Sequence, residues 1–302
     1  MAQTTDVVYV QEFNDNLKLL AQQRLSRFRP YVSVGSAHGE QMSPVDQLGE
    51  ATVEQRNSRY EPKGTNNIPH SRRWVLPTSY SSHLPEDDFD KLRKNVQLGS
   101  GYLKAQMQAM NRKMDDSAIL GIFGDNQTGK SGTTTESWDT GYNIAVGTTD
   151  LTVTKLLAAR QLLLEGDIDL DDPEEMIGCG ITPHQENTLI NSDELNNADY
   201  GNTVFDKARG LHGRTWFGIT FFITNRLTGA DFAADAAGAS ADREIPFFAK
   251  SGVHLGLWDD LRGTIVPRND LKGEPMEMST YATFGFTRIE QKKVIKIICK
   301  ET

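Results

Sequence analysis

The sequence lacks the residues of a disulfide-stapled or membrane-spanning fold. It contains two cysteines, Cys179 and Cys299, far apart and each within an apolar run. We therefore expect two buried, free thiols in a reducing compartment. No apolar run approaches the roughly 18 residues of a membrane-spanning helix, and no secretory pattern opens the chain. A membrane partner is not expected.

Apolar residues are also scarce for a chain of this length. The 302 residues are 37% hydrophobic, and the mean hydropathy is −0.49. Both values are low for one compact globule. Extended arms, which bury their apolar surface on neighbouring molecules, would give such a composition.

Positive charge is scarce as well. The net charge of −9 argues against binding nucleic acid by bulk electrostatics. Acidic and basic residues balance up to Lys130, and acids outnumber bases by about ten after it, which suggests that the two halves face different surroundings. Arg24, Arg27 and Arg29 form the only dense basic cluster near the start. This cluster is either a solvated arm or a surface that faces nucleic acid.

The first 84 residues predict extended structure. Residues 1–30 form an N-terminal arm with an amphipathic helical pattern that Pro30 ends. Residues 31–84 contain few Leu, Ile or Val and many Gly and Pro, with strand-like pieces at 50–56 and 72–76. They predict a long hairpin with too few apolar residues to cover itself, which is either disordered or lies on another subunit. The candidate contact residues are Arg56, Arg72, Arg73 and Trp74, with Trp74 as anchor.

Residues 85–123 predict a helical spine. Pro85 suits a first helical turn, the acids that follow it suit the positive end of the helix dipole, and Gly124 suits the C-terminal cap. The Gly99-Ser100-Gly101 cluster predicts a bend between a short and a long helix. One face repeats apolar residues at helical spacing: Leu103, Met107, Met110 and Met114.

The remainder predicts compact mixed α/β structure. Helices are expected at 151–165 and at 183–190, the second capped by Thr182. Strands are expected at 174–181, 216–224, 244–257 (a pair) and 276–301 (two strands), with an exposed loop at 227–243.

Residues 124–131, Gly-Asp-Asn-Gln-Thr-Gly-Lys-Ser, match the phosphate-binding pattern G-x-x-x-x-G-K-[ST]. Such a loop follows a strand and opens a helix, so that backbone N–H groups point at phosphate. Here a predicted helix precedes the motif and a Thr/Gly-rich stretch follows it. A loop at a helix exit is therefore favoured over nucleotide binding.

Other chemical motifs are weak. Asp167, Asp169 and Asp171 have the spacing of a calcium loop, but its turn glycine and its twelfth-position Glu are missing. The six histidines make no metal-ligating pattern, and no nucleophile elbow occurs. We predict no catalytic residue, no cofactor and no metal, and hence not an enzyme.

The order of these parts is similar to that of the major capsid proteins of tailed bacteriophages, which have the Hong Kong 97-type fold. Residues 151–160 resemble the second long helix of the peripheral domain. Residues 181–189, 199–200 and 210–218 resemble the entry into the axial domain. Residues 280–296 resemble the closing strands of one branch of the family.

The resemblance implies an α+β fold with an N-terminal arm (1–30), an extended hairpin loop lying on a neighbouring subunit (31–84), a spine helix and peripheral domain (85–180), an axial domain (181–274) and C-terminal strands that return to the peripheral domain (275–302). It implies hexamers and pentamers of an icosahedral shell around double-stranded DNA, assembled in the host cytoplasm. The implied partners are further copies of the chain, a portal and non-specifically contacted DNA, with a decoration protein as a further candidate. Because only some thirty residues precede the loop, a separate scaffolding protein is implied.

Three alternatives remain at this stage. A tail or adhesion structural protein would form tubes or fibres instead of shells. A nanocompartment shell of the same fold would hold enzyme cargo instead of DNA. A P-loop nucleotide hydrolase would depend on Lys130.

Overall fold

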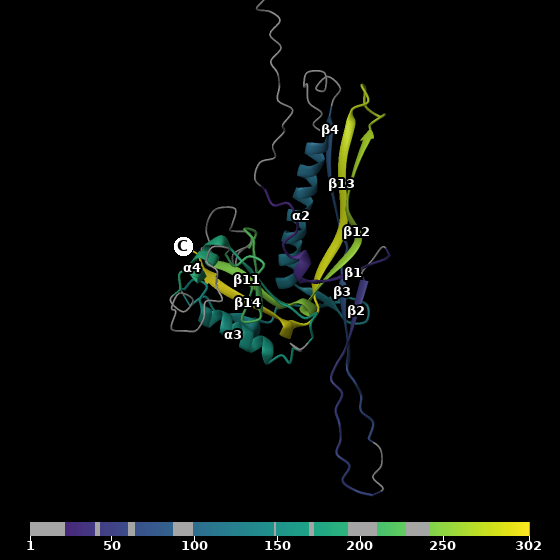
Figure 1. The fold of residues 1–302 in the computed structure, drawn as a ribbon. Helices are drawn as coiled ribbons and strands as arrows, with labels where there is room; N and C mark the ends of the chain where they lie inside the picture. The colour runs from purple at the N-terminus through teal and green to yellow at the C-terminus, as the bar shows by residue number, and fades with distance from the viewer. Residues whose placement is uncertain are drawn as a thin grey trace, which may run out of the picture. The chain divides into compact units, whose positions relative to one another are not determined.

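The computed structural model describes residues 22–39, 43–59, 64–86, 99–147, 149–168, 172–192, 210–227 and 242–301. It contains three α-helices within these ranges: α2 (Gly99–Phe123), α3 (Val153–Leu164) and α4 (Pro183–Ile190). No helix in the described part of the chain is both long and apolar enough to cross a membrane. Figure 1 shows the fold.

A six-stranded mixed sheet holds most of the core, in the order β7-β14-β11-β8-β10-β9. Its central strand β8 is buried along its whole length, and β8 pairs in parallel with β10 and antiparallel with β11. The strands are β7 (Asn143–Ile144), β8 (Ile177–Ile181), β9 (Thr215–Trp216), β10 (Ile219–Ile223), β11 (Asp242–Ala249) and β14 (Val294–Lys300).

A four-stranded sheet has the order β2-β3-β5-β6, and all of its neighbouring strands are antiparallel. It combines early residues of the chain with a hairpin that follows α2. Its strands are β2 (Ser43–Leu48), β3 (His70–Val75), β5 (Asn126–Thr128) and β6 (Thr134–Glu136).

A second four-stranded sheet has the order β1-β12-β13-β4. β1 pairs in parallel with the start of β12, from Ser33 opposite His254 to Ser36 opposite Leu257. Its strands are β1 (Ser33–Ser36), β4 (Thr78–Glu86), β12 (Val253–Pro267) and β13 (Met276–Arg288).

The chain divides into two compact units. The first consists of residues 1–25, 79–112 and 259–283, and the second of residues 26–78, 113–258 and 284–302. In the first unit the amide of Gln106 on α2 donates to the carbonyl of Met278 on β13 (3.3 Å). The second unit contains the six-stranded sheet and the sheet β2-β3-β5-β6.

The core of the second unit includes an aromatic cluster that anchors the last residues of the predicted arm (1–30). Phe28 is fully buried, with its ring centroid 4.9 Å from that of Phe222 and 6.4 Å from that of Phe248. Both cysteines are free and buried, as predicted. Burial raises the pKa of Cys299 to about 12, so the thiol is held in its unreactive neutral form.

The predicted long helix is present and begins where the sequence predicted, because α2 runs from Gly99 to Phe123. The helix start predicted at Pro85 is wrong. Pro85 and Glu86 are the last residues of the edge strand β4. An edge strand tolerates proline because it has a side without a neighbouring strand, where no backbone N–H is needed.

Gly99 to Gly101, where the bend between the two helices was predicted, are the first residues of α2. The short helix predicted before them falls mainly on residues 87–98, outside the described ranges. The helix ends at Phe123, as predicted. Gly124 does not take the left-handed conformation that was expected of a C-cap glycine, because its φ is not positive and its N–H makes a helical bond to the Leu120 carbonyl (2.8 Å).

Further strand predictions need correction. Residues 50–56 form no strand, since the hairpin strands are β2 and β3. Residues 33–36 belong to the body and not to an extended loop, because β1 pairs with β12. The single strand predicted at 216–224 is the hairpin β9–β10. The loop predicted at 227–243 falls mostly on residues 228–241, which lie outside the described ranges.

The predicted helices α3 and α4 are confirmed. Thr182 caps α4 in a reciprocal capping box: its hydroxyl accepts from the Gln185 N–H, and the Gln185 side chain accepts from the Thr182 N–H. Pro183 fills the first helical position, where an N–H is not needed.

Candidate subunit interface

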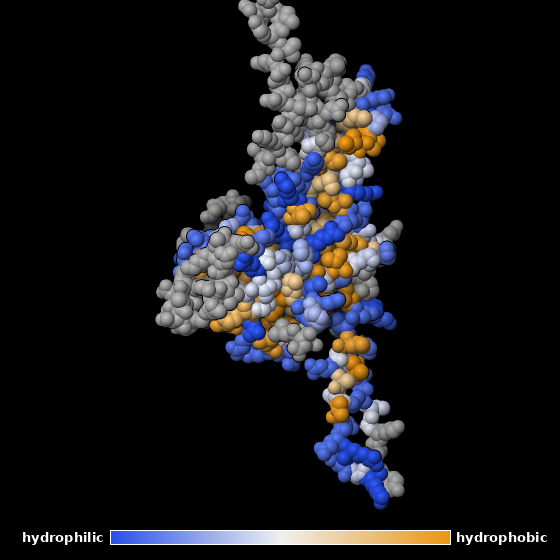
Figure 2. Space-filling view, viewed as in Figure 1, coloured by the Kyte–Doolittle hydropathy of each residue, from blue (hydrophilic) through white to orange (hydrophobic). Residues whose placement is uncertain are grey.

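Between β2 and β3 the chain makes a long excursion, residues 49–69, which leaves the sheet and returns to it. Every described residue from Leu48 to Ser71 is exposed. The two ends lie side by side, because the Gly49 N–H donates to the Pro69 carbonyl (2.7 Å). Figure 2 shows apolar residues along the excursion. Val53 within it is 95% exposed, and Leu48, the last residue of β2, is 72% exposed.

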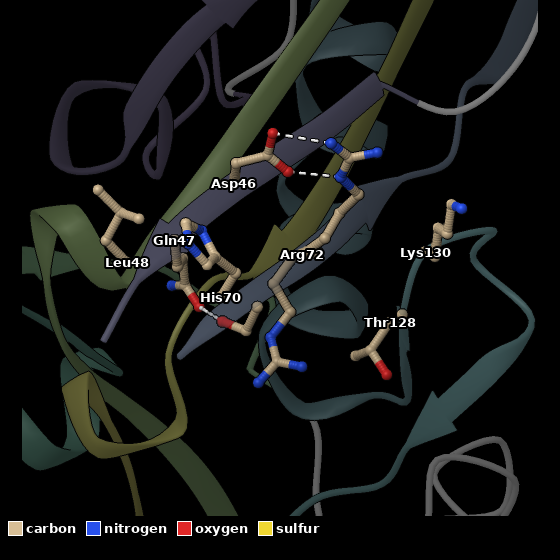
Figure 3. Close-up of a pocket in the computed structure, with 10 residues that line it drawn as sticks. Asp46, Gln47, Leu48, His70, Arg72, Thr128 and Lys130 are labelled. Atoms are coloured by element: carbon tan, nitrogen blue, oxygen red, sulfur yellow. Dashed lines mark hydrogen bonds and ion pairs between the residues drawn. The ribbon is translucent and has the colours of Figure 1, made fainter. Parts of the chain in front are cut away.

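A pocket of about 560 Å³ lies at the base of this excursion. Its walls come from the end of β2, the start of β3 and the turn after β5 (Figure 3). The lining residues are Asp46, Gln47, Leu48, His70, Ser71, Arg72, Arg73, Thr128, Gly129 and Lys130.

Arg72 crosses from β3 to the carboxylate of Asp46 on β2. Its Nη2 donates to Asp46 Oδ2 (2.9 Å) and its Nε to Asp46 Oδ1, as the dashed lines in Figure 3 show. The guanidinium also lies 5.5 Å from the ring centroid of Trp74. The hydrogen bond from Arg72 lowers the pKa of the Asp46 carboxyl, which stays ionised.

Arg73 and Trp74 are held by their own chain. Arg73 forms an ion pair with Glu136 on β6, and its Nε donates to the Ile289 carbonyl (3.0 Å). The indole N–H of Trp74 donates to the Gly129 carbonyl (2.7 Å), which ties the β5–β6 turn to β3. Of the predicted contact residues, the structure therefore brings Arg72, Arg73 and Trp74 together on one strand.

The fourth predicted contact residue, Arg56, lies in the excursion itself. Its guanidinium donates to the carbonyls of Ser58 (3.1 Å) and Arg59 (2.8 Å). These bonds curl the chain locally and leave the apolar side chains of the excursion uncovered.

The predicted nucleic-acid-facing arginines fall in both units: Arg24 in the first, Arg27 and Arg29 in the second. Arg27 is partly exposed, and its Nη1 lies 3.1 Å from His212 Nε2. Burial, and then the charge of Arg27, lowers the pKa of His212. A role of the three arginines toward nucleic acid stays a prediction.

The motif at 124–131 forms a β-hairpin. Asn126–Thr128 are β5, Thr134–Glu136 are β6, and the turn between them places Gly129 and Gly132 at positive φ (85° and 70°). A phosphate-binding loop leads from a strand into a helix, whereas this loop leads from strand to strand. Lys130 lies in this turn and lines the pocket.

Sequence reasoning missed two residues of this site. Lys130 was noticed only as part of a motif, and nothing local indicated that its turn would lie beside β3. Asp46 carried no signal, because its pairing with Arg72 depends on the register of β2 and β3.

Three solved phage capsids contain chains with a similar fold. The chain aligns with a chain of the capsid of Cyanophage P-SCSP1u with a TM-score of 0.69 and 16% identity, covering 100% of this chain and 96% of that one. For a chain of the Cyanophage Pam1 capsid the TM-score is 0.72 and the identity is 11%, and the alignment covers 99% of both chains. For a chain of the capsid of Ralstonia phage GP4 the TM-score is 0.68 and the identity is 12%, and the alignment covers 100% of this chain and 98% of that one.

These likenesses confirm the α+β, Hong Kong 97-type capsid fold that the sequence predicted. A family model described as phage capsid protein matches residues 6–301, and the chain belongs to this family. No curated protein matches it.

Proposed function

We propose that the chain is the major capsid protein of a tailed bacteriophage, and that its copies form the hexamers and pentamers of an icosahedral shell around double-stranded DNA. Membership of the phage capsid protein family supports this function, as does the fold shared over nearly the whole chain. The protein then belongs to the capsid of the virion, assembles in the host cytoplasm and has a structural role without catalysis.

The excursion between β2 and β3 is the observation that carries the proposal. Every described residue from Leu48 to Ser71 is exposed, and within the described part of this stretch the ladder between β2 and β3 ends at Leu48 and His70. Burial of apolar surface is the main favourable term in association. A neighbouring copy of the chain would supply that burial, so we propose that the extended loop predicted at 31–84 acts through residues 49–69.

A loop-closure variant tests the proposal. Gly49 and Pro69 are hydrogen-bonded neighbours, so residues 50–68 can be replaced by the hairpin turn Asn-Gly without stretching β2 or β3. We expect a folded subunit with a wild-type melting temperature that forms no shells. Sedimentation velocity and negative-stain electron microscopy measure assembly, and circular dichroism measures folding.

A matched pair of point variants distinguishes the effect on assembly of losing a contact at the loop from the effect of losing any exposed leucine. Leu48→Ser changes an exposed leucine at the base of the loop, and Leu157→Ser changes one on α3 (45% exposed). We expect Leu48→Ser to impair assembly more. Wild-type shells from the loop-closure variant would overturn the role proposed for the loop.

The other predicted partners and the domain scheme form part of the same proposal. We propose that a portal and a separate scaffolding protein take part in assembly, and that Arg24, Arg27 and Arg29 face the packaged DNA. Charge reversal of all three arginines should then lower the DNA content of purified particles without lowering their number.

Two alternative functions have less support. Nucleotide hydrolysis would need a phosphate-binding loop, whereas residues 124–131 lie in and around the β5–β6 hairpin. A nanocompartment shell would share the fold, but the matching family model is that of phage capsid proteins. Nuclease-protected DNA inside the particles, without enzyme cargo, would distinguish the two kinds of shell.

A further inference from the structure

The pocket at the base of the excursion is lined by one cationic side chain, Lys130, that has no ion-pair partner among the described residues. Arg72 is paired with Asp46 and Arg73 with Glu136. Among the described residues, no carboxylate lies within ion-pair distance of Lys130, which is exposed in the turn after β5. The pocket therefore carries a local positive charge on a chain whose net charge is −9.

The surroundings of Lys130 are held in place. The Gly129 carbonyl accepts the indole N–H of Trp74, and Thr128 pairs with Arg73 in the strand ladder. Lys130 thus follows two residues that are fixed to β3. A cation carried by an ordered turn loses less conformational freedom on pairing than one on a free loop.

We propose that this pocket binds a carboxylate side chain from a second copy of the chain, and that Lys130 is its partner. The inference rests on the proposed function and adds the chemistry of one contact to it. A cavity of about 560 Å³ is large enough for a few side chains and too small for a folded element. The exposed Leu48 in its wall offers apolar contact beside the charge.

Position favours a copy of the chain as the partner. Leu48 and His70, the residues that flank the excursion, both line the pocket. A neighbouring copy that covers the excursion would therefore reach the pocket as well. Such a copy offers 41 acidic residues, and these outnumber the basic ones mainly after Lys130.

Charge arrangement argues against DNA at this pocket. Binding to the phosphate backbone uses an array of cations that follows the strand and releases counterions. Here a single unpaired ammonium lies in a recess, and Asp46 stands in the same wall. A partly exposed ion pair of this kind contributes more to orientation and association rate than to affinity.

Zero-length crosslinking tests the inference. A water-soluble carbodiimide joins an ammonium group to a carboxylate only when the two are in contact. Particles would be assembled from equal amounts of ¹⁴N- and ¹⁵N-labelled full-length chain, treated with carbodiimide and digested. We expect a mixed-isotope peptide pair that joins Lys130 to an Asp or Glu and is at least tenfold less abundant in unassembled subunits.

Lys130→Arg is the matched variant, because a guanidinium keeps the charge but does not form the amide. It should assemble normally and lose only this crosslink. Lys272→Arg, which changes another exposed lysine in a turn, should keep it.

Three results would overturn the inference: a Lys130 crosslink within one chain, one to a different protein, or none while other intersubunit crosslinks form. In each case assembly itself is intact, so the proposed function survives. A preparation that never assembles, even with its scaffold, would instead overturn the proposed function and this inference with it.

Discussion

The hydroxyl of Ser26 donates a 2.6 Å hydrogen bond to the carboxylate of Asp115, which is fully buried on α2. The same carboxylate accepts the backbone N–H groups of Arg27 (3.0 Å) and Phe28 (3.4 Å). One side chain of the long helix thus accepts hydrogen bonds from three successive residues near the end of the predicted arm. The next residue of the chain after Arg27, Phe28, packs in the aromatic core, so Asp115 fixes the backbone that leads into that core.

Asp115→Ala should destabilise the second unit by about 2–4 kcal/mol, because several buried donors lose their acceptor. Urea denaturation of the unassembled subunit measures the change. Asp116→Ala is the control on the same helix: its partner Arg226 is about one-third exposed, so the expected loss is about 0–1 kcal/mol. Equal losses for the two variants would contradict the buried role of Asp115.

Gly285 on β13 packs directly against the backbone of Leu76. A Cβ at position 285 would lie 2.1 Å from the Leu76 carbonyl oxygen, which belongs to backbone and cannot move alone. Gly285→Ala should therefore cost at least about 2 kcal/mol of stability.

Gly178→Ala is the matched control, since a Cβ there would meet Phe248 and Tyr31 at 3.4 Å, an ordinary contact distance. We expect its melting temperature to change much less than that of Gly285→Ala. A wild-type melting temperature for Gly285→Ala would contradict the close packing of the Leu76 backbone against Gly285.

The sequence predicted best where the signals are local. Thr182, Pro183 and Gln185 specify the start of α4 within four residues, and the structure follows them. Pro85 gave an equally strong helix signal, but the chain there is the edge strand of a sheet with β13. Pairing with a distant strand overrode the local preference.

The candidate interface was only partly predictable for the same reason. The sequence predicted contact residues where a tryptophan follows two arginines. These residues, Arg72, Arg73 and Trp74, lie on β3. Lys130 reaches the same pocket because β5 pairs with β3, about fifty residues away in sequence. No period or motif within either segment encodes that pairing.

Acidification should weaken the contact between β1 and β12 through His254. Burial lowers the pKa of His254 below its ordinary value of 6.5. The Ser33 hydroxyl donates to the Val253 carbonyl (2.8 Å) and can therefore accept from the Nδ1–H of His254 (3.1 Å). A protonated ring keeps this donor, so burial is what disfavours the charged form. Below pH 6.5 the unfolded chain binds a proton more readily than the folded one, so stability falls as the pH falls through this range.

Urea midpoints at pH 7.5 and pH 5.5 measure this effect. His254→Asn should reduce the difference between the two midpoints, although it does not abolish it, because His212 also has a lowered pKa. An unchanged difference in His254→Asn would assign the pH dependence to other groups.

The turn between β9 and β10 holds a phenylalanine in an unfavourable conformation. Trp216 pairs with Ile219, so Phe217 and Gly218 form a two-residue turn, and both have positive φ (50° and 74°). This is the φ pattern of a type I′ turn, which favours Asn-Gly. A bulky side chain at positive φ costs roughly 1–2 kcal/mol.

Phe217→Asn should therefore stabilise the unassembled subunit by about 0.5–1 kcal/mol, even after the ring contact with Trp216 is lost. The side chain is 54% exposed, so its removal leaves no large cavity. Phe217→Val is the control, because a β-branched residue tolerates positive φ least and should lower the melting temperature. Destabilisation by Phe217→Asn would mean that the ring contributes more through packing than it costs in backbone strain.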